Sequence, residues 1–192
     1  MCGIIGYVGG RPCRELILGG LERLEYRGYD SAGISLLSPG GGNGDGPFET
    51  VRSVGKLQAL LDAASDSDGE ATLGLGHTRW ATHGRVTQDN AHPHTSADGQ
   101  VVVVMNGIIE NFQRLRSDLQ NEGVVFTSET DTEVLPHLIA RAYSGDLAAA
   151  VREVLPQLGG PFAFVAAHAD EPDQLVAARR ECPLVVGVGD GE

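Results

Sequence analysis

The 192-residue sequence contains little lysine, cysteine or aromatic side chain, and no long apolar run. Lys56 is the single lysine, and the formal net charge of -12 argues against the clustered cations that neutralise nucleic-acid phosphates. Apolar runs such as Val101–Met105 are far shorter than the roughly 20 residues that cross a bilayer. The N-terminus lacks the basic stretch and the apolar segment of a signal peptide. We therefore expect a cytoplasmic protein that binds neither nucleic acid nor membrane.

Cysteine is limited to Cys2, Cys13 and Cys182. Their odd number and the lack of CxxC spacing argue against a disulfide framework or a zinc knuckle, and they fit a reducing compartment. The hydrophobic content of 41% and the charged content of 21% are typical of a globular protein. A chain of 192 residues is long enough to bury a substantial core in one large domain or a compact pair.

Hydrophobic patterning predicts a mixed fold. Short segments rich in β-branched residues predict strands at residues 3–9, 31–37, 48–54, 72–80, 100–105, 162–168, 174–179 and 184–188. Apolar residues at helical spacing predict helices at residues 12–26, 56–64, 110–122, 131–143 and 147–158. The strands occur in clusters and do not alternate strictly with helices. This order favours two sheets covered by helices, an α+β arrangement, over a doubly wound parallel sheet.

Cys2 is the strongest candidate for a nucleophile. If Met1 is removed, Cys2 carries both a thiol and the α-amine of the chain. An α-amine with a pKa of about 8 is partly neutral at pH 7 and can accept the proton of the neighbouring thiol. Such a nucleophile needs no separate histidine base. The first six residues equally allow Cys2 to be a small apolar residue that begins a strand.

Two arginines lie in polar segments near the ends of predicted elements. Arg27, in segment 25–33, could orient a neighbouring loop, or it could form a surface ion pair with Asp30 that is worth about 1 kcal/mol at most. Arg79 lies in segment 77–84, together with two hydroxyls and two imidazoles. Its planar guanidinium suits a carboxylate, which it can hold with two parallel hydrogen bonds.

Two further segments have both a structural and a chemical interpretation. Asn106-Gly107 offers a side-chain amide and an accessible backbone N–H, the components of an oxyanion hole, but the same dipeptide is the strongest short signal for a hairpin turn. The residues alone favour the turn. Segment 128–133 resembles a capping box, in which Asp131 would charge a helix N-terminus, although Asp131 could instead bind a ligand ammonium. Here the residues alone favour the cap.

Taken together, these groups fit one kind of substrate. A carboxylate site, an ammonium site and an oxyanion hole beside a thiol describe attack on the side-chain amide of an amino acid. One alternative is a metal-dependent hydrolase, because His77, His83, His92 and His94 lie in one region of the sequence. A histidine–X–histidine pair can chelate zinc, but a third ligand and a supporting shell are not identifiable. Another alternative is a non-catalytic sensor whose pocket binds the same amino acid, which retention of Met1 would favour.

The motifs also carry a family resemblance. Cys2-Gly3-Ile4 is similar to the start of class II glutamine amidotransferases, which are N-terminal-nucleophile hydrolases. Further segments, in order along essentially the whole chain, resemble the glutaminase domain of glucosamine-6-phosphate synthases: Tyr26–Ser31, His77–Gly84, Asn90–His94, Asn106–Asn111 and Ser128–Glu133. The first two of these segments distinguish the sugar enzymes from other class II amidotransferases.

The resemblance implies a four-layer α/β/β/α sandwich of two antiparallel sheets. It implies that Cys2, freed of Met1 and using its own α-amine as base, hydrolyses L-glutamine to glutamate and ammonia through a thioester. The Asn106 side chain and the Gly107 N–H would form the oxyanion hole. No cofactor and no metal are implied.

The resemblance also assigns the substrate-binding positions. Arg79, Thr82 and His83 would hold the glutamine carboxylate, while Asp131 and the Gly107 backbone would hold its ammonium. Trp80 would lie at the base of a loop, roughly residues 79–87, that closes over the substrate. Arg27 would support the nucleophile from behind.

The family's activity extends beyond this sequence. In the family, sugar-isomerase domains follow and use the ammonia to convert fructose 6-phosphate to glucosamine 6-phosphate. Those domains are not present here, so we expect residues 1–192 to be a glutaminase domain truncated at its C-terminal end. The full-length protein is expected to be a homo-oligomer. An amidotransferase that acts on another keto sugar is an alternative.

Two positions depart from the family pattern. Met105 stands where many members have a histidine, which could alter the support of the oxyanion hole. Cys182 stands where relatives often have a small hydroxyl residue, and it is expected to be a buried structural thiol.

Overall fold

A computed structural model describes residues 2–38, 46–81 and 84–192 of the chain. Its first sheet has the strand order β1-β4-β2-β3, and each neighbouring pair is antiparallel. The four strands are β1 (Gly3–Val8), β2 (Ser31–Leu37), β3 (Phe48–Val54) and β4 (Leu73–Arg79). This order places the N-terminal strand at an edge, directly beside β4.

The second sheet has the order β5-β6-β7-β8 and is also antiparallel. Its strands are β5 (His94–Thr95), β6 (Val101–Gly107), β7 (Phe162–His168) and β8 (Val176–Arg180). Because β5 has only two residues, it pairs with β6 only at Val102 and Val103. The later part of β6 therefore has a sheet partner on one side only.

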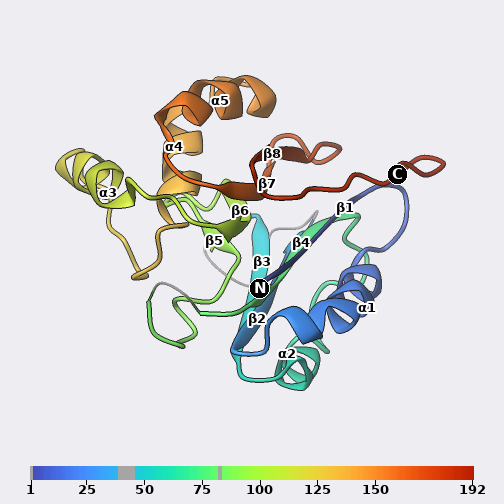
Figure 1. The fold of residues 1–192 in the computed structure, drawn as a ribbon. Helices are drawn as coiled ribbons and strands as arrows, with labels where there is room; N and C mark the ends of the chain where they lie inside the picture. The colour runs from blue at the N-terminus through green and yellow to red at the C-terminus, as the bar shows by residue number, and fades with distance from the viewer. Residues whose placement is uncertain (1, 39–45, 82–83) are drawn as a thin grey trace.

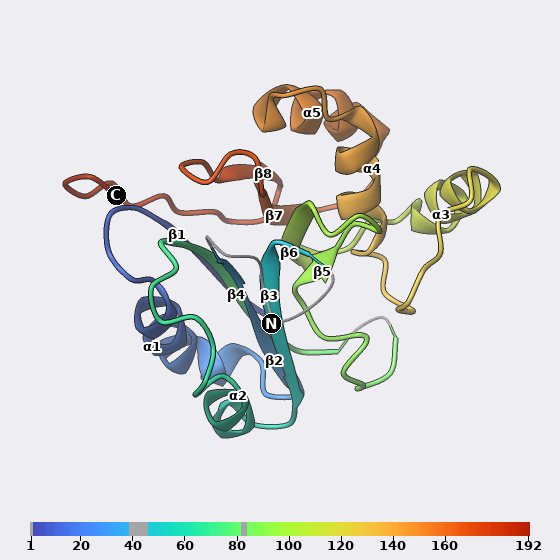
Figure 2. The ribbon, with the colours of Figure 1, turned by 180° about the vertical axis from the view of Figure 1, so that it is seen from behind.

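Helices cover the outer faces of both sheets (Figures 1 and 2). The helices on the first sheet are α1 (Arg14–Leu24) and α2 (Leu57–Ala63), with the 3-10 turn η1 (Glu25–Arg27) after α1. The helices on the second sheet are α3 (Phe112–Asn121), α4 (Val134–Ala142) and α5 (Leu147–Val154), with the 3-10 turn η2 (Leu155–Gln157). The predicted four-layer α/β/β/α arrangement is therefore confirmed.

The valine run of β6 explains why this strand lies in the middle of the layers. Successive side chains of a strand point to opposite faces of the sheet. Val101 and Val103 pack in the cluster formed with α3, α4 and α5, whereas Val102 and Val104 pack in the cluster between the two sheets. All four side chains are fully buried. Burying each one stabilises the fold by about 1.5–3 kcal/mol relative to exposure.

Strand β4 alternates leucine with glycine for a related reason. Leu73 and Leu75 are buried in the cluster between the sheets. The intervening glycines face α1: a Cβ at Gly76 would lie 2.5 Å from the Ile17 side chain. The absence of side chains at these positions lets α1 pack directly on the strand that ends in Arg79.

Most of the predicted elements are confirmed, with shifts of at most four residues at their ends. The predicted strand at residues 184–188 is wrong, because that segment is not paired with any strand. Val185 and Val188 in it are 91% and 90% exposed. In the described part of the chain, no helix is both long enough and apolar enough to cross a membrane.

Candidate active site

The pairing of β1 with β4 places Cys2 at the centre of the candidate site. Gly3 is opposite Thr78 in this pair, so Cys2 lies beside the residues that follow β4. The Cys2 Sγ accepts a hydrogen bond from the Trp80 N–H at 3.2 Å and lies 3.6 Å from the Trp80 carbonyl oxygen. Burial raises the pKa of the Cys2 thiol above its ordinary value, although the Trp80 hydrogen bond and the charge of Arg79 oppose this rise. The thiol is therefore largely protonated at neutral pH.

Asn106 reaches the same point from the second sheet. Its Nδ2 donates a hydrogen bond to the Cys2 carbonyl oxygen at 3.2 Å. Asn106 and Gly107 are the last residues of β6 and pair with Ala163 and Phe162 of β7. The prediction of a hairpin turn at Asn106-Gly107 is therefore wrong. The end of β6 in the second sheet therefore meets the start of β1 in the first sheet, at Cys2.

Gly107 has a backbone conformation that favours glycine, with φ of +110°. A Cβ at this position would also overlap the carbonyl oxygen of Pro161. The backbone stays close to Pro161 at the next residue, because the Ile108 N–H donates a hydrogen bond to the same Pro161 oxygen at 2.9 Å. A side chain at position 107 would thus displace the backbone immediately after Asn106.

Arg79 is a nearly buried cation close to Cys2. Only 4% of the residue is exposed. Its Nη1 donates to the carbonyl oxygen of Arg85 at 3.2 Å and its Nη2 to that of Gly84 at 3.4 Å. Burial lowers the pKa of the Arg79 guanidinium, while interactions with Cys2, Asp131 and Asp30 raise it. The guanidinium is therefore positioned within electrostatic range of both a thiol and a carboxylate.

Asp131 supplies the opposite charge and is only 5% exposed. Its Oδ2 accepts a hydrogen bond from the Ile109 N–H at 2.7 Å, which ties Asp131 to the residues that follow β6. The predicted capping role of Asp131 is wrong, because α4 begins at Val134 after Glu133 and has no side-chain cap. Asp131 instead lies close to the end of β6 and interacts with Arg79.

Glu133 organises the segment that carries Asp131. Its carboxylate accepts hydrogen bonds from the N–H and hydroxyl groups of both Thr127 and Ser128, at 2.6–3.0 Å. Burial acts to raise the pKa of Glu133, but His137 and these hydrogen bonds have a larger effect in the opposite direction. The pKa of Glu133 therefore lies below its ordinary range. Glu133 therefore binds Thr127 and Ser128 within its own segment, and residues 128–133 do not form the predicted capping box.

Gly28 and Asp30 support the backbone beside Cys2, a role that their residue types did not predict. A Cβ at Gly28 would lie 2.8 Å from the Arg79 carbonyl carbon and 3.0 Å from the Trp80 nitrogen. Asp30 donates its N–H to the Arg79 carbonyl oxygen, and its Oδ2 accepts from the Ala81 N–H at 2.9 Å. The one available signal was their position within the Tyr26–Ser31 motif.

Asn90 joins the segment after β4 to the segment that carries Asp131, a role that the sequence did not reveal. Its Oδ1 accepts from the Glu129 N–H at 2.7 Å. Its Nδ2 donates to the Arg85 carbonyl oxygen at 3.0 Å and to Glu129 Oε2 at 3.2 Å. Because Arg79 also donates to Arg85, these contacts connect the candidate carboxylate site with the candidate ammonium site.

The remaining predicted site residues are placed as follows. Trp80 is 44% exposed and packs edge-to-face against Tyr29, with ring centroids 5.4 Å apart. Arg27 is half-buried in η1, next to the close contact that Gly28 makes with the end of β4. Thr82 and His83 lie outside the described residues, as does Met1. Cys182 is half-exposed, so its expected burial is wrong.

Three buried histidines, His77, His92 and His94, form a cluster beside β6. The rings of His77 and His92 are stacked, with centroids 4.1 Å apart and planes 16° apart, and His94 packs edge-to-face on His92. Burial lowers the pKa of His77 to about 4 and that of His94 to about 3, and it lowers the pKa of His92 well below the ordinary value. Within the described ranges, no group of three or more His, Cys, Asp or Glu side chains converges as metal ligands do.

The sequence and the fold are similar to those of known amidotransferases. Residues 77–191 match the family described as "Glutamine amidotransferase domain". The whole chain is 52% identical to a glutamine–fructose-6-phosphate aminotransferase [isomerizing] of Mycolicibacterium paratuberculosis and 50% identical to one of Aquifex aeolicus. It covers 31% of each of these relatives. The chain thus spans about a third of the length of the curated relatives that it matches.

Two solved structures have the same fold. One is the glutamine phosphoribosylpyrophosphate amidotransferase of B. subtilis, complexed with ADP and GMP, with a TM-score of 0.75 and 24% identity. The match covers 93% of this chain and 37% of that one. The other is described as the allosteric regulatory enzyme of purine biosynthesis, with a TM-score of 0.72, 26% identity and coverage of 88% and 36%. These likenesses confirm the predicted N-terminal-nucleophile type of fold.

Proposed function

Because the chain belongs to the glutamine amidotransferase domain family, we propose that it hydrolyses the side-chain amide of L-glutamine to glutamate and ammonia. One observation carries the proposal: Asn106 Nδ2 donates to the Cys2 carbonyl oxygen, so an amide donor lies beside a thiol. The buried Arg79–Asp131 pair lies close to that point. A nucleophile, an oxyanion donor and a charge pair for an amino acid are the groups that this reaction requires.

The first step is attack of the Cys2 sulfur on the amide carbon of glutamine. Because burial raises the pKa of the thiol, the sulfur needs a base to accept its proton. Removal of Met1 gives Cys2 an α-amine with an ordinary pKa of about 8, which accepts this proton directly or through a water. The sulfur–carbon bond forms as the carbonyl π electrons move onto oxygen.

The second step is collapse of the tetrahedral intermediate. The Asn106 Nδ2 and the Gly107 N–H donate to the oxyanion, a kind of stabilisation worth about 100- to 1000-fold in rate per donor. The carbon–nitrogen bond breaks, and the departing nitrogen takes the proton from the α-amine and leaves as ammonia. Water then attacks the glutamyl thioester, which yields glutamate and restores the thiol.

Substrate recognition is proposed for the charged groups. Arg79 holds the α-carboxylate of glutamine, assisted by Thr82 and His83, and glutamine takes the place of the Gly84 and Arg85 carbonyl oxygens on the guanidinium. Asp131 and the Gly107 backbone hold the α-ammonium. Trp80 covers the substrate from the exposed side, and Arg27 supports the backbone behind Cys2.

The proposal also extends to the fate of the ammonia. The relatives named above are aminotransferases of fructose 6-phosphate, and each is about three times as long as this chain. We propose that, in a protein of that length, ammonia from Cys2 aminates fructose 6-phosphate to give glucosamine 6-phosphate. Such a protein is proposed to act in the cytoplasm as a homo-oligomer.

The experiment is a glutaminase assay on purified chain whose mass shows that Met1 has been removed. We expect equal amounts of glutamate and ammonia from L-glutamine, and no ammonia from D-glutamine, whose ammonium and carboxylate cannot both reach Asp131 and Arg79. Cys2→Ala should abolish the activity, and Cys182→Ala, which changes another half-exposed thiol, should retain it. Glutamine binding by the processed chain without turnover would support a sensor instead.

A further inference from the structure

We propose that His77 is a positioning residue for the oxyanion hole: as a neutral imidazole with its proton on Nε2, it orients the Asn106 amide so that Nδ2 faces the nucleophile. This inference rests on the proposed glutaminase function. His77 is 1% exposed and lies in β4, two residues before Arg79. It therefore has no access to substrate and acts through Asn106.

The hydrogen-bond partners of His77 determine which nitrogen carries its proton. Nε2 lies 3.0 Å from the Met105 carbonyl oxygen and 3.1 Å from Asn106 Oδ1. A backbone carbonyl can only accept a hydrogen bond, so Nε2 must be the donor. Nδ1 is buried and has no hydrogen-bond partner among the described residues, which is consistent with the unprotonated nitrogen of a neutral ring. Burial lowers the pKa of His77 to about 4, so the ring stays neutral near pH 7.

That proton in turn determines the orientation of the Asn106 amide. With Oδ1 toward His77, Nδ2 donates to the Cys2 carbonyl oxygen and its second N–H remains available for an oxyanion. In the reversed orientation, two donors would face each other at His77 and two acceptors would face each other at Cys2. Both contacts would lose a hydrogen bond, which costs about 1–3 kcal/mol for each buried group.

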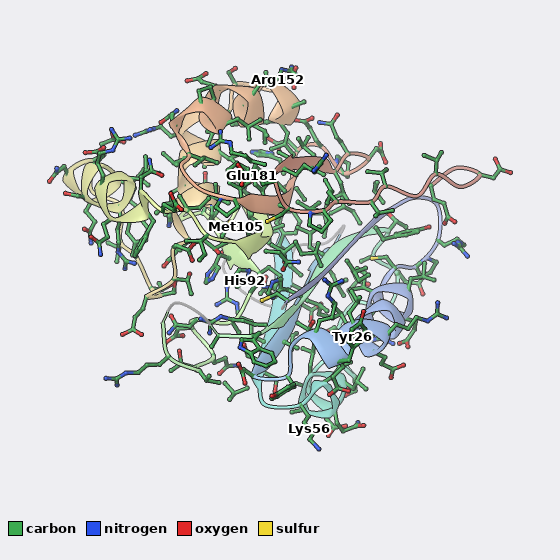
Figure 3. The ribbon with its side chains drawn as sticks, viewed as in Figure 1. Tyr26, Lys56, His92, Met105, Arg152 and Glu181 are labelled. Carbon is green, nitrogen blue, oxygen red and sulfur yellow. The ribbon has the colours of Figure 1, made fainter. Side chains whose placement is uncertain are left out.

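His92 stacks on the His77 ring and binds the Met105 peptide, so it holds both in place. His92 and Met105 are labelled in Figure 3. The β5–β6 pairing ends at His94 and Val103, and its continuation would place the His92 backbone opposite Met105. Instead, the ring Nδ1 of His92 accepts the Met105 N–H at 3.3 Å, while the His77 ring binds the Met105 carbonyl oxygen. Two stacked imidazoles thus replace the missing strand partner just before Asn106.

The proposed role separates two chemical properties of the site. Hydrolysis of glutamine needs both the Cys2 sulfur and the oxyanion hole. Alkylation of Cys2 by iodoacetamide displaces iodide from a saturated carbon, forming a sulfur–carbon bond without an oxyanion. Loss of His77 should therefore lower kcat for glutamine and leave the alkylation rate of Cys2 unchanged, whereas general damage to the site would lower both.

The test compares His77→Phe with His168→Gln, which changes a buried histidine far from Cys2, in chains that lack Met1. We expect His77→Phe to lower kcat about 100-fold, with KM and the iodoacetamide rate within about threefold of the unchanged chain. His168→Gln should alter none of these values. A kcat within threefold in His77→Phe, or an equal fall in the alkylation rate, would overturn the proposal.

Two further measurements cover the remaining outcomes. If His77→Phe does not fold, His77→Gln, whose amide can donate to Asn106, should have at least about tenfold higher kcat than His77→Asn, whose shorter amide cannot reach. Equal values would contradict the proposal.

Nitrogen-15 NMR of the unchanged chain tests the tautomer without an activity assay: we expect His77 to be neutral with its proton on Nε2 at pH 7. An inactive chain with that tautomer would refute the proposed function but not the geometry.

Discussion

At the scale of single residues, Arg79 combines deep burial with two hydrogen bonds to backbone carbonyl oxygens. Its planar fork is suited to a carboxylate in a way that a lysine ammonium is not. We predict that Arg79→Lys raises the KM for glutamine about 10- to 100-fold with a smaller change in kcat, because a charge-assisted hydrogen bond is lost.

Steady-state kinetics checks this prediction. The control is Arg152→Lys, an exposed exchange on α5 at the outer layer of the molecule (Figure 3). That control should leave KM unchanged. If Arg79→Lys also left KM unchanged, the carboxylate would have to bind elsewhere.

Gly28 matters because its missing side chain leaves room for the backbone of Arg79 and Trp80. Its φ of -167° is accessible to any residue, so a substitution causes no backbone strain. We predict that Gly28→Ala lowers kcat about 10- to 100-fold, because the new Cβ displaces Arg79 and Trp80 and hence the N–H that contacts Cys2. The matched control is Gly10→Ala, which has no atom within 4 Å of its new Cβ. Equal activity of the two variants would show that the contact at Gly28 does not matter.

Residue chemistry predicted some site residues from the sequence and missed others. Cys2 and Arg79 were identifiable as candidates because a thiol beside the α-amine suits a nucleophile and a planar guanidinium suits a carboxylate, although the residues alone equally allowed Cys2 to begin a strand. Gly28, Asp30 and Asn90 contact backbone groups such as those of Ala81 and Arg85. Those partners are known only once the chain has folded, so residue type alone gave no signal.

At the scale of elements, segment 127–133 depends on one carboxylate. Glu133 accepts four hydrogen bonds from Thr127 and Ser128, and Glu133 is only 3% exposed. We predict that Glu133→Gln lowers the free energy of unfolding by about 2–4 kcal/mol, because an amide nitrogen would face hydrogen-bond donors. Urea unfolding at pH 7.5 measures this change.

The control for Glu133 is Glu153→Gln on the exposed side of α5. An exposed substitution of this kind should change stability by no more than about 0.5 kcal/mol. A similarly small change in Glu133→Gln would contradict the central role of its carboxylate.

Predictions for elements succeeded where burial and local pattern agreed, as in β2 and β7, whose predicted bounds match. They failed where pairing decided the result. Residues 184–188 have high β propensity, but this propensity needs a partner strand, and the described chain offers them none. Asn106-Gly107 has the composition of a turn, yet pairing with Ala163 and Phe162 keeps both residues in β6.

At the scale of the whole molecule, the two sheets meet around neutral imidazoles. In the unfolded chain, His77, His92 and His94 protonate with a pKa of about 6.5. Burial in the folded chain lowers the pKa of His77 to about 4 and that of His94 to about 3, and it lowers the pKa of His92 well below the ordinary value. The unfolded state therefore binds more protons in this range, and stability falls as the pH decreases. We predict a loss of about 1.4 kcal/mol per pH unit for each of these histidines between pH 6 and pH 5.

Urea unfolding at a series of pH values tests this linkage. His94→Gln, which can keep a hydrogen bond to Thr130, should reduce the dependence by about 1.4 kcal/mol per pH unit. An unfolding midpoint that did not change between pH 7 and pH 5 would mean that the imidazoles are not buried as neutral groups.

The central claim is that Cys2, after removal of Met1, is a reactive nucleophile in a site that binds glutamine. The most direct measurement is the intact mass of the chain before and after treatment with 6-diazo-5-oxo-L-norleucine, an electrophile that mimics glutamine. We predict a chain without Met1 that gains one adduct, located on Cys2, and that L-glutamine protects from the reaction. A processed chain that gains no adduct, or gains it on Cys182 instead, would contradict the proposed function.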